Sequence, residues 1–178
     1  MTGRVSIRKI AFAGVLAALY AALTMALGEF GYGPVQFRIA EALCILPFFF
    51  PFTVWGLFVG CIIANIISPF FLDIILGPTA TLLAALCTMW LGKLSKRQSV
   101  PIKALACFPP VIFNALIIGA MIAYLTMGDQ EPVGFAFAFS FVGLGQLVVM
   151  YGLGLPLMIY LPKIRAVEKL NELYGGSL

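Results

Sequence analysis

The chain has 178 residues, of which 62% are hydrophobic and 10% are charged, and its formal net charge is +4. A soluble domain carries about 25% charged residues, so this composition excludes soluble enzymes and nucleic-acid-binding modules and indicates an integral membrane protein. The chain has no histidine, which excludes histidine-based acid–base catalysis and nearly all catalytic zinc sites.

Apolar segments long enough to cross a bilayer follow one another along the chain. About 20 helical residues span the hydrocarbon core, and a proline interrupts the helical hydrogen-bond ladder. We therefore divide the long apolar stretch 39–68 into two helices at Pro51. The predicted helices cover residues 10–27, 39–50, 52–68, 74–92, 104–127 and 133–161, and a polar cytoplasmic tail covers 162–178.

The basic residues determine the predicted orientation of these helices. Ten of the eleven lysines and arginines fall in three clusters, at residues 4–9, 93–103 and 163–169, and the positive-inside bias places all three in the cytoplasm. An even number of crossings must then separate Lys9 from Lys93, so the stretch 39–68 crosses twice. We predict an all-α bundle of six transmembrane helices, formed by residues 1–178 as one domain, with both termini in the cytoplasm.

Two parallel tracks of small residues, each repeating every four residues, run along the first predicted helix. They are Ala13, Ala17 and Ala21 and, one residue further on, Gly14, Ala18 and Ala22. Small residues at this spacing let a neighbouring helix approach closely in lipid. Packing inside the bundle and docking of another protein both explain the pattern, and spacing alone does not separate them.

Polar side chains at membrane depth are informative, because a central charge costs about 2.5–3.5 kcal/mol to insert. Arg38 and Glu41 lie three residues apart, a spacing that can form an ion pair, which acts either as a clamp on the loop or in ligand binding. The candidate binding residues are Tyr32, Gln36, Arg38, Glu41, Asn65, Asp73, Asn114 and Gln146. Asn114 and Gln146 could alternatively form hydrogen bonds between helices. Together these residues predict one polar cavity, open to the outside, that binds a small, planar, polar molecule.

Motifs for an energy source or a catalyst are missing from the sequence. A P-loop requires G-x-x-x-x-G-K-[ST], whereas Gly92 and Lys93 are followed by Leu94. The four cysteines form no C-x-x-C pair, and no serine has a base partner at a suitable depth. We therefore expect no catalytic site, no metal and no cofactor. A pocket without an energy source indicates a binding subunit driven by another protein.

Four strings carry a family resemblance. They are YGPVQFRIAEAL (32–43), GCIIAN (60–65), LDIILG with ATLLAA (72–77 and 80–85) and NALIIG (114–119). They resemble the substrate-binding (S) components of energy-coupling-factor vitamin transporters, and in particular the QueT-type branch for queuosine precursors. The resemblance covers most of the chain, and the first string, with Arg38 and Glu41, is its most specific part.

The resemblance implies a division of labour in the bacterial cell membrane. An S component captures its substrate outside and then docks on a membrane coupling protein, which rests on two cytoplasmic ATPases. By that pattern the coupling protein contacts Ala13 and Ala17 of the first helix, and the neighbouring Gly14 and Ala18 are further candidates for the same contact.

The implied ligand is a 7-deazaguanine, such as the nitrile or aminomethyl precursor, or queuine. A carboxylate can accept the adjacent N–H donors of such a ring in bidentate fashion, and Glu41 or Asp73 could supply it. Arg38, Gln36, Asn114 or Gln146 could donate to the ring carbonyl.

Three other functions fit the same polar residues. The first is an S component for a different vitamin. The second is a small membrane enzyme acting on lipid headgroups, with the outer carboxylates as acid–base groups or metal ligands. The third is a channel-forming oligomer, whose polar residues would line a continuous pore. Titration of the purified protein with deazaguanines and then with vitamins separates these functions.

Overall fold

The computed structural model describes residues 6–32, 36–95, 99–127 and 132–174. These described residues form helices and connecting segments and contain no strand. Four helical stretches are long and apolar enough to cross a membrane, namely Ile7–Ala26, Asp73–Leu94, Val100–Thr126 and Val133–Lys163. Two shorter apolar helices, Ile39–Phe49 and Thr53–Asn65, occupy the second and third predicted positions. The predicted all-helical membrane class is confirmed.

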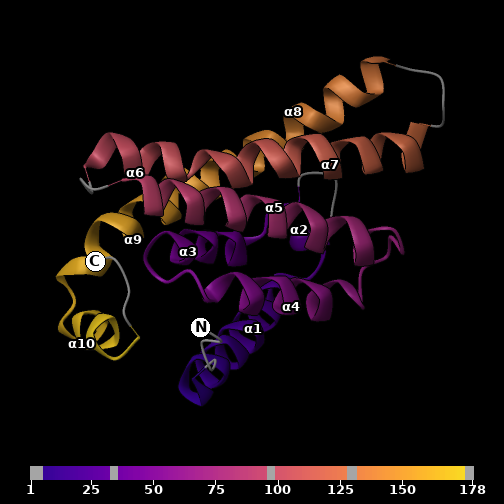
Figure 1. Cartoon of the computed structure of the whole chain (residues 1–178). Coiled ribbons are helices and arrows are strands. Elements are labelled where there is room, and N and C mark those ends of the chain that lie inside the picture. The colour runs from indigo at the N-terminus through magenta and orange to yellow at the C-terminus, as the bar shows by residue number, and fades with distance from the viewer. Residues whose placement is uncertain (1–5, 33–35, 96–98, 128–131, 175–178) are drawn as a thin grey trace.

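The helices follow one another as Figure 1 shows. Most are α-helices; η1 and η4 are 3-10 helices, and η3 is a single π-helical turn. In chain order they are α1 (Ile7–Ala26), α2 (Glu29–Tyr32), η1 (Ile39–Ile45), α3 (Leu46–Phe49), α4 (Thr53–Asn65), α5 (Asp73–Leu94), α6 (Val100–Ala106), α7 (Phe108–Met127), α8 (Pro132–Val149), η3 (Met150–Gly154), α9 (Leu155–Tyr160), η4 (Leu161–Lys163) and α10 (Arg165–Tyr174).

The second predicted helix differs from expectation in its first half, which is the 3-10 helix η1. Pro47 has no N–H group and cannot make the α-helical bond to the Leu43 carbonyl. The Leu46 N–H donates to that carbonyl instead, in the i→i+3 pattern. Arg38 precedes η1 with an extended backbone, so it lies outside the helix and its side chain does not follow helical spacing.

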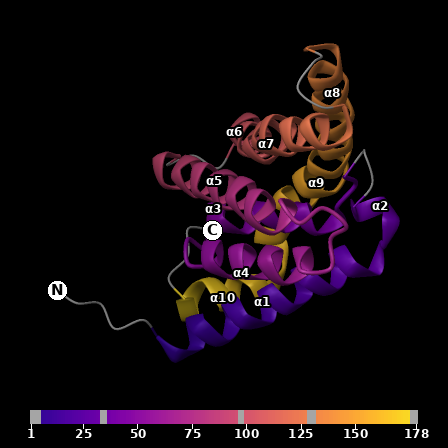
Figure 2. The ribbon, with the colours of Figure 1, turned by 90° about the vertical axis from the view of Figure 1, so that its right-hand side faces the viewer.

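The helices pack in a row. α1 packs on α4, α4 on α5, α5 on α7 and α7 on α8, and Figure 2 shows them in this order from one side of the molecule to the other. η1 lies in the middle, where it contacts α1, α5 and η3. The core therefore surrounds the segment that follows Arg38.

Contacts at the two ends of the bundle, measured along the helix axes, show which way the short helices run. At one end, the Tyr32 hydroxyl donates to the Ala64 carbonyl at 2.6 Å. At the other end, the Phe52 ring lies 5.6 Å from the Phe12 ring and 5.4 Å from the Tyr174 ring. Thus η1 and α3 lead from the first end to the second, and α4 returns.

Three lysines mark the second end, which we call the basic end. Lys9 lies over the Phe52 ring at 5.6 Å, Lys103 over the Phe49 ring at 5.7 Å, and Lys163 over the Tyr160 ring at 5.1 Å. The opposite end, with Tyr32 and Ala64, is called the distal end. The predicted clustering of basic groups on one side is thus visible in these three residues.

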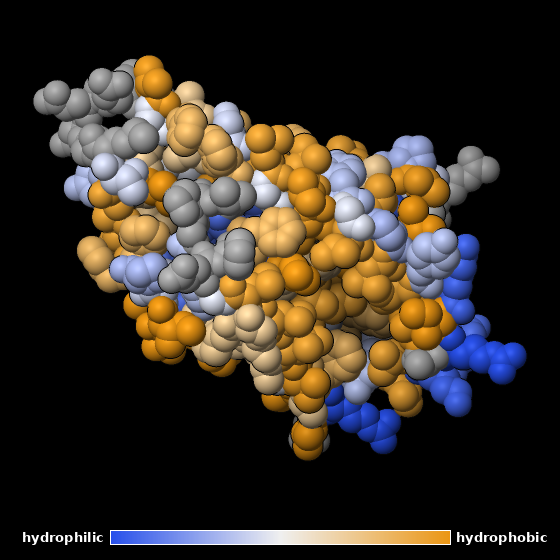
Figure 3. Space-filling view, turned by 180° about the vertical axis from the view of Figure 1, so that it is seen from behind, coloured by the Kyte–Doolittle hydropathy of each residue, from blue (hydrophilic) through white to orange (hydrophobic). Residues whose placement is uncertain are grey.

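Large apolar side chains cover the outside of the molecule between these ends. Trp55, Phe71 and Ile75 are 64%, 70% and 65% exposed. In Figure 3 hydrophobic residues cover most of the visible face, and strongly hydrophilic residues gather at one edge. Such a surface needs an apolar solvent, which the bilayer provides. The chain is therefore a multi-pass membrane protein.

Candidate binding site

Arg38 points into the distal end of the bundle and forms a buried ion pair. Its Nη2 donates to Asp73 Oδ2 at 2.5 Å and its Nε donates to the Gly31 carbonyl at 2.9 Å. The two side chains are only 2% and 0% exposed, and the guanidinium lies 5.5 Å from the Tyr32 ring. Burial lowers the pKa of Arg38, but the surrounding acidic groups, of which Asp73 contributes most, together raise it by more, so Arg38 stays charged.

Asp73 begins α5, where the helix dipole favours a negative charge. Ser68 Oγ donates to its Oδ2 at 3.1 Å, and Asn65 Nδ2 donates to its main-chain carbonyl at 2.8 Å. The buried Oδ1 atoms of Asp73 and Asn65 have no hydrogen-bond partner. Two acceptors are thus left unpaired in the interior, beside an otherwise satisfied ion pair.

Gly77 makes room for Asn65 and Asp73 to meet. A Cβ atom at this position would lie 2.1 Å from Asn65 Nδ2 and 2.7 Å from Asp73 Oδ1. The absence of a side chain therefore lets both polar groups lie against the same turn of α5.

Glu41 lies on η1 and accepts three hydrogen bonds from neighbouring elements. Tyr20 on α1 donates to Oε1 at 2.5 Å, Thr81 on α5 donates to Oε1 at 3.2 Å, and Cys44 donates to Oε2 at 3.2 Å. Glu41 and Tyr20 are both 0% exposed. Both oxygens of this buried carboxyl group therefore have hydrogen-bond partners.

Cys61 joins the two carboxylate groups into one cluster. Its Sγ lies 3.3 Å from Thr81 Oγ1 and 3.6 Å from Asn65 Nδ2. Contacts of this kind run without interruption from Arg38 to Tyr20. We call the group the distal cluster, and its members are Tyr20, Arg38, Glu41, Cys61, Asn65, Asp73 and Thr81.

The structure corrects two expectations about this region. Arg38 does not pair with Glu41 but with Asp73, because Arg38 precedes η1 in extended backbone. The predicted open cavity is instead a closed cluster, since the side chains of Arg38, Glu41, Asn65 and Asp73 are at most 2% exposed.

Tyr20 is a cluster residue that the sequence analysis missed. It occurs in an alanine-rich helix without any charged neighbour, and the sequence pattern assigned it no role. Its register was the available signal, because Tyr20 shares the face of α1 that carries Ala17 and Ala21, which are 4% and 5% exposed.

The remaining candidates differ in their surroundings. Gln36 has a backbone φ of 50°, a left-handed conformation that only a few per cent of non-glycine residues adopt, and its buried amide nitrogen and oxygen are both unpaired. Gln146 on α8 has an unpaired Oε1. Asn114 donates to the Pro110 carbonyl of its own helix at 2.9 Å. Asn114 and Gln146 thus lie on α7 and α8, outside the distal cluster.

The two tracks of small residues on α1 have different environments. A Cβ on Gly56 would lie 2.6 Å from the Ala13 carbonyl oxygen, and one on Gly60 would lie 2.7 Å from that of Ala17. The track with Ala13 and Ala17 therefore packs on α4, and Ala17, at 4% exposed, has almost no surface for another protein. Gly14 has no neighbouring atom within 4 Å of its Cβ position. In that track Ala18 and Ala22 are also exposed.

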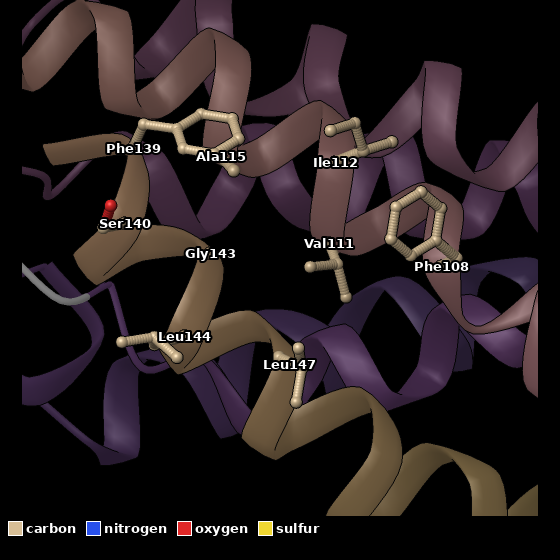
Figure 4. A pocket seen from close by; sticks show the side chains of 9 residues that line it. All are labelled: Phe108, Val111, Ile112, Ala115, Phe139, Ser140, Gly143, Leu144 and Leu147. Carbon is tan, nitrogen blue, oxygen red and sulfur yellow. The ribbon is translucent and has the colours of Figure 1, made fainter. Parts of the chain in front are cut away.

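A cavity of about 390 Å³ lies apart from the distal cluster, between α7 and α8 (Figure 4). Its lining is Phe108, Val111, Ile112, Ala115, Phe139, Ser140, Gly143, Leu144 and Leu147. The Ser140 hydroxyl donates to the Ala136 carbonyl at 2.7 Å, so the lining offers little to a polar ligand. None of the candidate polar residues lines this cavity.

Replacing Tyr20 with Phe is expected to destabilise the protein. The change removes one hydrogen-bond partner from the buried Glu41 carboxyl group, and the loss of a buried partner costs about 1–3 kcal/mol. Thermal unfolding of the purified protein in detergent measures the loss. Tyr124→Phe is the control, because Tyr124 is 61% exposed and should melt as the unmodified protein does. Equal melting of both variants would contradict the role of the Tyr20 hydroxyl.

Comparison with known proteins agrees with the resemblance seen in the sequence. Residues 10–163 match the family described as QueT transporter. The chain belongs to the QueT transporter family. That family is described as one of transporters and not of enzymes.

One curated relative matches part of the chain. It is the queuosine precursor transporter QueT of Lactococcus lactis subsp. cremoris (strain MG1363), with 40% identity over 70 residues. The match covers 38% of this chain and 41% of the relative. The matched part of this chain thus spans about two fifths of the length of that relative. No solved structure matches this chain significantly.

Proposed function

We propose that this QueT-family chain is the substrate-binding subunit of an energy-coupling-factor importer and that it captures a queuosine precursor. The family and the relative's name support a queuosine precursor as cargo. The observation that carries the proposal is that two buried acceptors of the distal cluster, Asn65 Oδ1 and Asp73 Oδ1, have no hydrogen-bond partner, and that the buried amide of Gln36 is also unpaired. Each such atom is costly when left unpaired, and a polar ligand would satisfy them.

The proposed topology has six crossings, with both termini in the cytoplasm of a bacterial cell. Two observations support it: η1 with α3 runs opposite to α4, and Lys9, Lys103 and Lys163 share the basic end. The positive-inside bias then assigns the basic end to the cytoplasm. In this orientation the distal cluster lies toward the outside, where a substrate arrives.

The proposed ligand is a 7-deazaguanine, whose ring N–H groups need acceptors and whose lactam carbonyl needs a donor. Asp73 Oδ1 and Asn65 Oδ1 are unpaired acceptors in the distal cluster. Gln36 offers both a donor and an acceptor on one amide, which can pair with the adjacent N–H and C=O of a lactam. Binding requires the cluster to open, because its members are buried in this conformation.

We propose that the exposed track of α1, Gly14 and Ala18, contacts the membrane coupling protein, and that two ATPases supply the energy. The track with Ala13 and Ala17 has a different role, because it packs against α4. Small residues on an exposed face of a membrane helix allow close approach of a second helix. One track is therefore assigned to the bundle and the other to the partner.

The function is tested by calorimetric titration of the purified protein in detergent with 7-deazaguanine derivatives. We expect saturable binding of at least one of them and no binding of riboflavin, thiamine or biotin. Binding of a vitamin in place of every deazaguanine would show that the chain serves a different substrate. Mass spectrometry of any co-purified small molecule is an independent measurement of the same point.

Docking is tested with Gly14→Leu, which adds a bulky side chain where no atom lies within 4 Å. We expect unchanged substrate binding but at least a tenfold loss of co-purification with the coupling protein. Val15→Leu is the control, because Val15 is 70% exposed and lies beside the track. Retained co-purification of Gly14→Leu would contradict the assignment of this track to the partner.

A further inference from the structure

The cavity between α7 and α8 lies between two close contacts. On its distal side, a Cβ on Gly119 would lie 2.9 Å from Phe139 Cα. On its basic side, the Tyr151 hydroxyl donates to the Ala104 carbonyl at 3.0 Å. The lining residues of α7 begin at Phe108, which is the first residue of that helix. The cavity therefore occupies the part of the helix pair that is nearer the basic end.

The cavity opens outward and its lining is apolar, as Figure 4 shows. Phe108, Leu144 and Leu147 line it and are 45%, 61% and 45% exposed. Among the nine described lining residues only Ser140 has a polar side-chain atom, and its hydroxyl already donates to a carbonyl of its own helix. A retained water molecule needs about two to four polar partners, which this lining does not offer. The lining therefore favours a hydrocarbon occupant.

The depth of the cavity suits an acyl chain whose headgroup lies at the basic end. Within the helical stretch Val100–Thr126, Lys103 is five residues before Phe108 and twelve residues before Ala115. At about 1.5 Å per residue, these intervals are about 8 Å and about 18 Å along the axis. One leaflet contributes about 15 Å of hydrocarbon, half of the bilayer core. An acyl chain that starts beside Lys103 thus reaches the far end of the cavity near the bilayer midplane.

Two lysines at the basic end lack acidic partners. Lys103 is only 6% exposed, and Lys163 is exposed on the segment that follows α9, which packs on α6. Among the described residues the one ion pair joins Arg38 and Asp73 in the distal cluster, so neither lysine has a carboxylate partner there. A buried cation is costly unless it is paired. The apolar cavity and these lysines are separate observations, and one amphiphile with an anionic headgroup satisfies both.

We infer that the cavity between α7 and α8 binds one acyl chain of an anionic phospholipid, and that Lys103 and Lys163 bind its phosphate group. The bilayer supplies this occupant, and the bundle need not open because the cavity already faces outward. An apolar helix of a partner protein would meet the same lining but would leave both lysines without an anion. The lipid site is separate from the proposed substrate site, because no residue of the distal cluster lines the cavity.

The site is tested by native mass spectrometry of the purified protein after exchange into an equal mixture of phosphatidylglycerol and phosphatidylcholine with the same acyl chains. We expect one phosphatidylglycerol molecule to remain bound. Its retention should exceed that of phosphatidylcholine about 10- to 30-fold, the range for two lysines beside an anionic headgroup. Equal retention of the two lipids would overturn the inference.

Ser140→Phe tests the acyl-chain contact, because it places an aromatic ring in the cavity. We expect about tenfold lower retention of phosphatidylglycerol, since the ring takes the place of buried methylene groups. Ala136→Phe is the matched control, because Ala136 is exposed one turn earlier on α8 and does not line the cavity. Equal retention by the two variants would place the lipid elsewhere and overturn the site.

Lys103→Gln with Lys163→Gln tests the headgroup contact and leaves the cavity intact. We expect retention of phosphatidylglycerol to fall to that of phosphatidylcholine. Lys93→Gln with Lys169→Gln removes the same charge from two exposed positions and should keep the preference. Equal loss in both double variants would show general attraction and overturn the site. Loss of the coupling protein with retained lipid in Ser140→Phe would also overturn it, because a partner helix would then occupy the cavity. Substrate titration tests the proposed function alone, since the two sites share no residue.

Discussion

Replacing Asp73 with Leu is expected to lower the free energy of unfolding by about 3–5 kcal/mol, because it leaves the buried charge of Arg38 without its partner. Arg38 is 2% exposed and has its ion-pair contact with the Asp73 carboxylate at 2.5 Å. Without that carboxylate the guanidinium must either stay unpaired in the interior or pull the loop before η1 toward water. Unfolding of the purified protein in mixed micelles measures the change.

A double variant distinguishes the ion pair from simple loss of packing. Exchange of a buried ion pair for apolar side chains of similar size is often neutral or stabilising. Arg38→Met with Asp73→Leu should therefore recover most of the stability that Asp73→Leu loses, although it should bind no deazaguanine. If the double variant is as unstable as the single one, the unpaired charge of Arg38 is not the cause.

Replacing Gly60 with Val is expected to separate α1 from α4. Its Cβ would lie 2.7 Å from the Ala17 carbonyl oxygen and 2.9 Å from Tyr20 Cβ, and overpacking of this kind costs about 1–3 kcal/mol. Because Tyr20 donates to Glu41, the shift of α1 also disturbs the distal cluster. We therefore expect both a lower melting temperature and weaker substrate binding, measured on the same detergent preparation.

Gly14→Val is the matched control for Gly60→Val, because both changes place the same side chain in a membrane helix. Nothing lies within 4 Å of the Gly14 Cβ position, so stability and substrate binding should stay as in the unmodified protein. Similar losses in the two variants would show that the close approach of α1 to α4 at Gly60 has no special importance.

These predictions link packing to the binding site through α1. Ala17 and Tyr20 lie one turn apart, and both meet α4 at Gly60. One helix thus positions a donor to the Glu41 carboxylate on its inner face and presents Gly14 and Ala18 outward. A partner that moves α1 would also move Tyr20. In the proposed importer this geometry connects docking to the state of the distal cluster.

The helical boundaries were largely predictable from the sequence. α1, α4 and α5 begin and end within about three residues of the predicted limits, because prolines, glycines and polar residues bound each apolar run. The 3-10 start of the second segment and the break between α6 and α7 were not predicted. Both depend on local hydrogen bonding near prolines, to which hydropathy is insensitive.

By itself the sequence determined that this protein lies in a membrane, belongs with the QueT family and carries a small set of intramembrane polar residues. Those properties follow from composition, charge clusters and short strings, each of which can be read locally. The tertiary structure decided that Arg38 pairs with Asp73 instead of Glu41, that Tyr20 serves Glu41, and which small-residue track faces inward. These choices depend on how closely distant helices approach one another at Gly56, Gly60 and Gly77. The spacing of residues along the chain does not determine that distance.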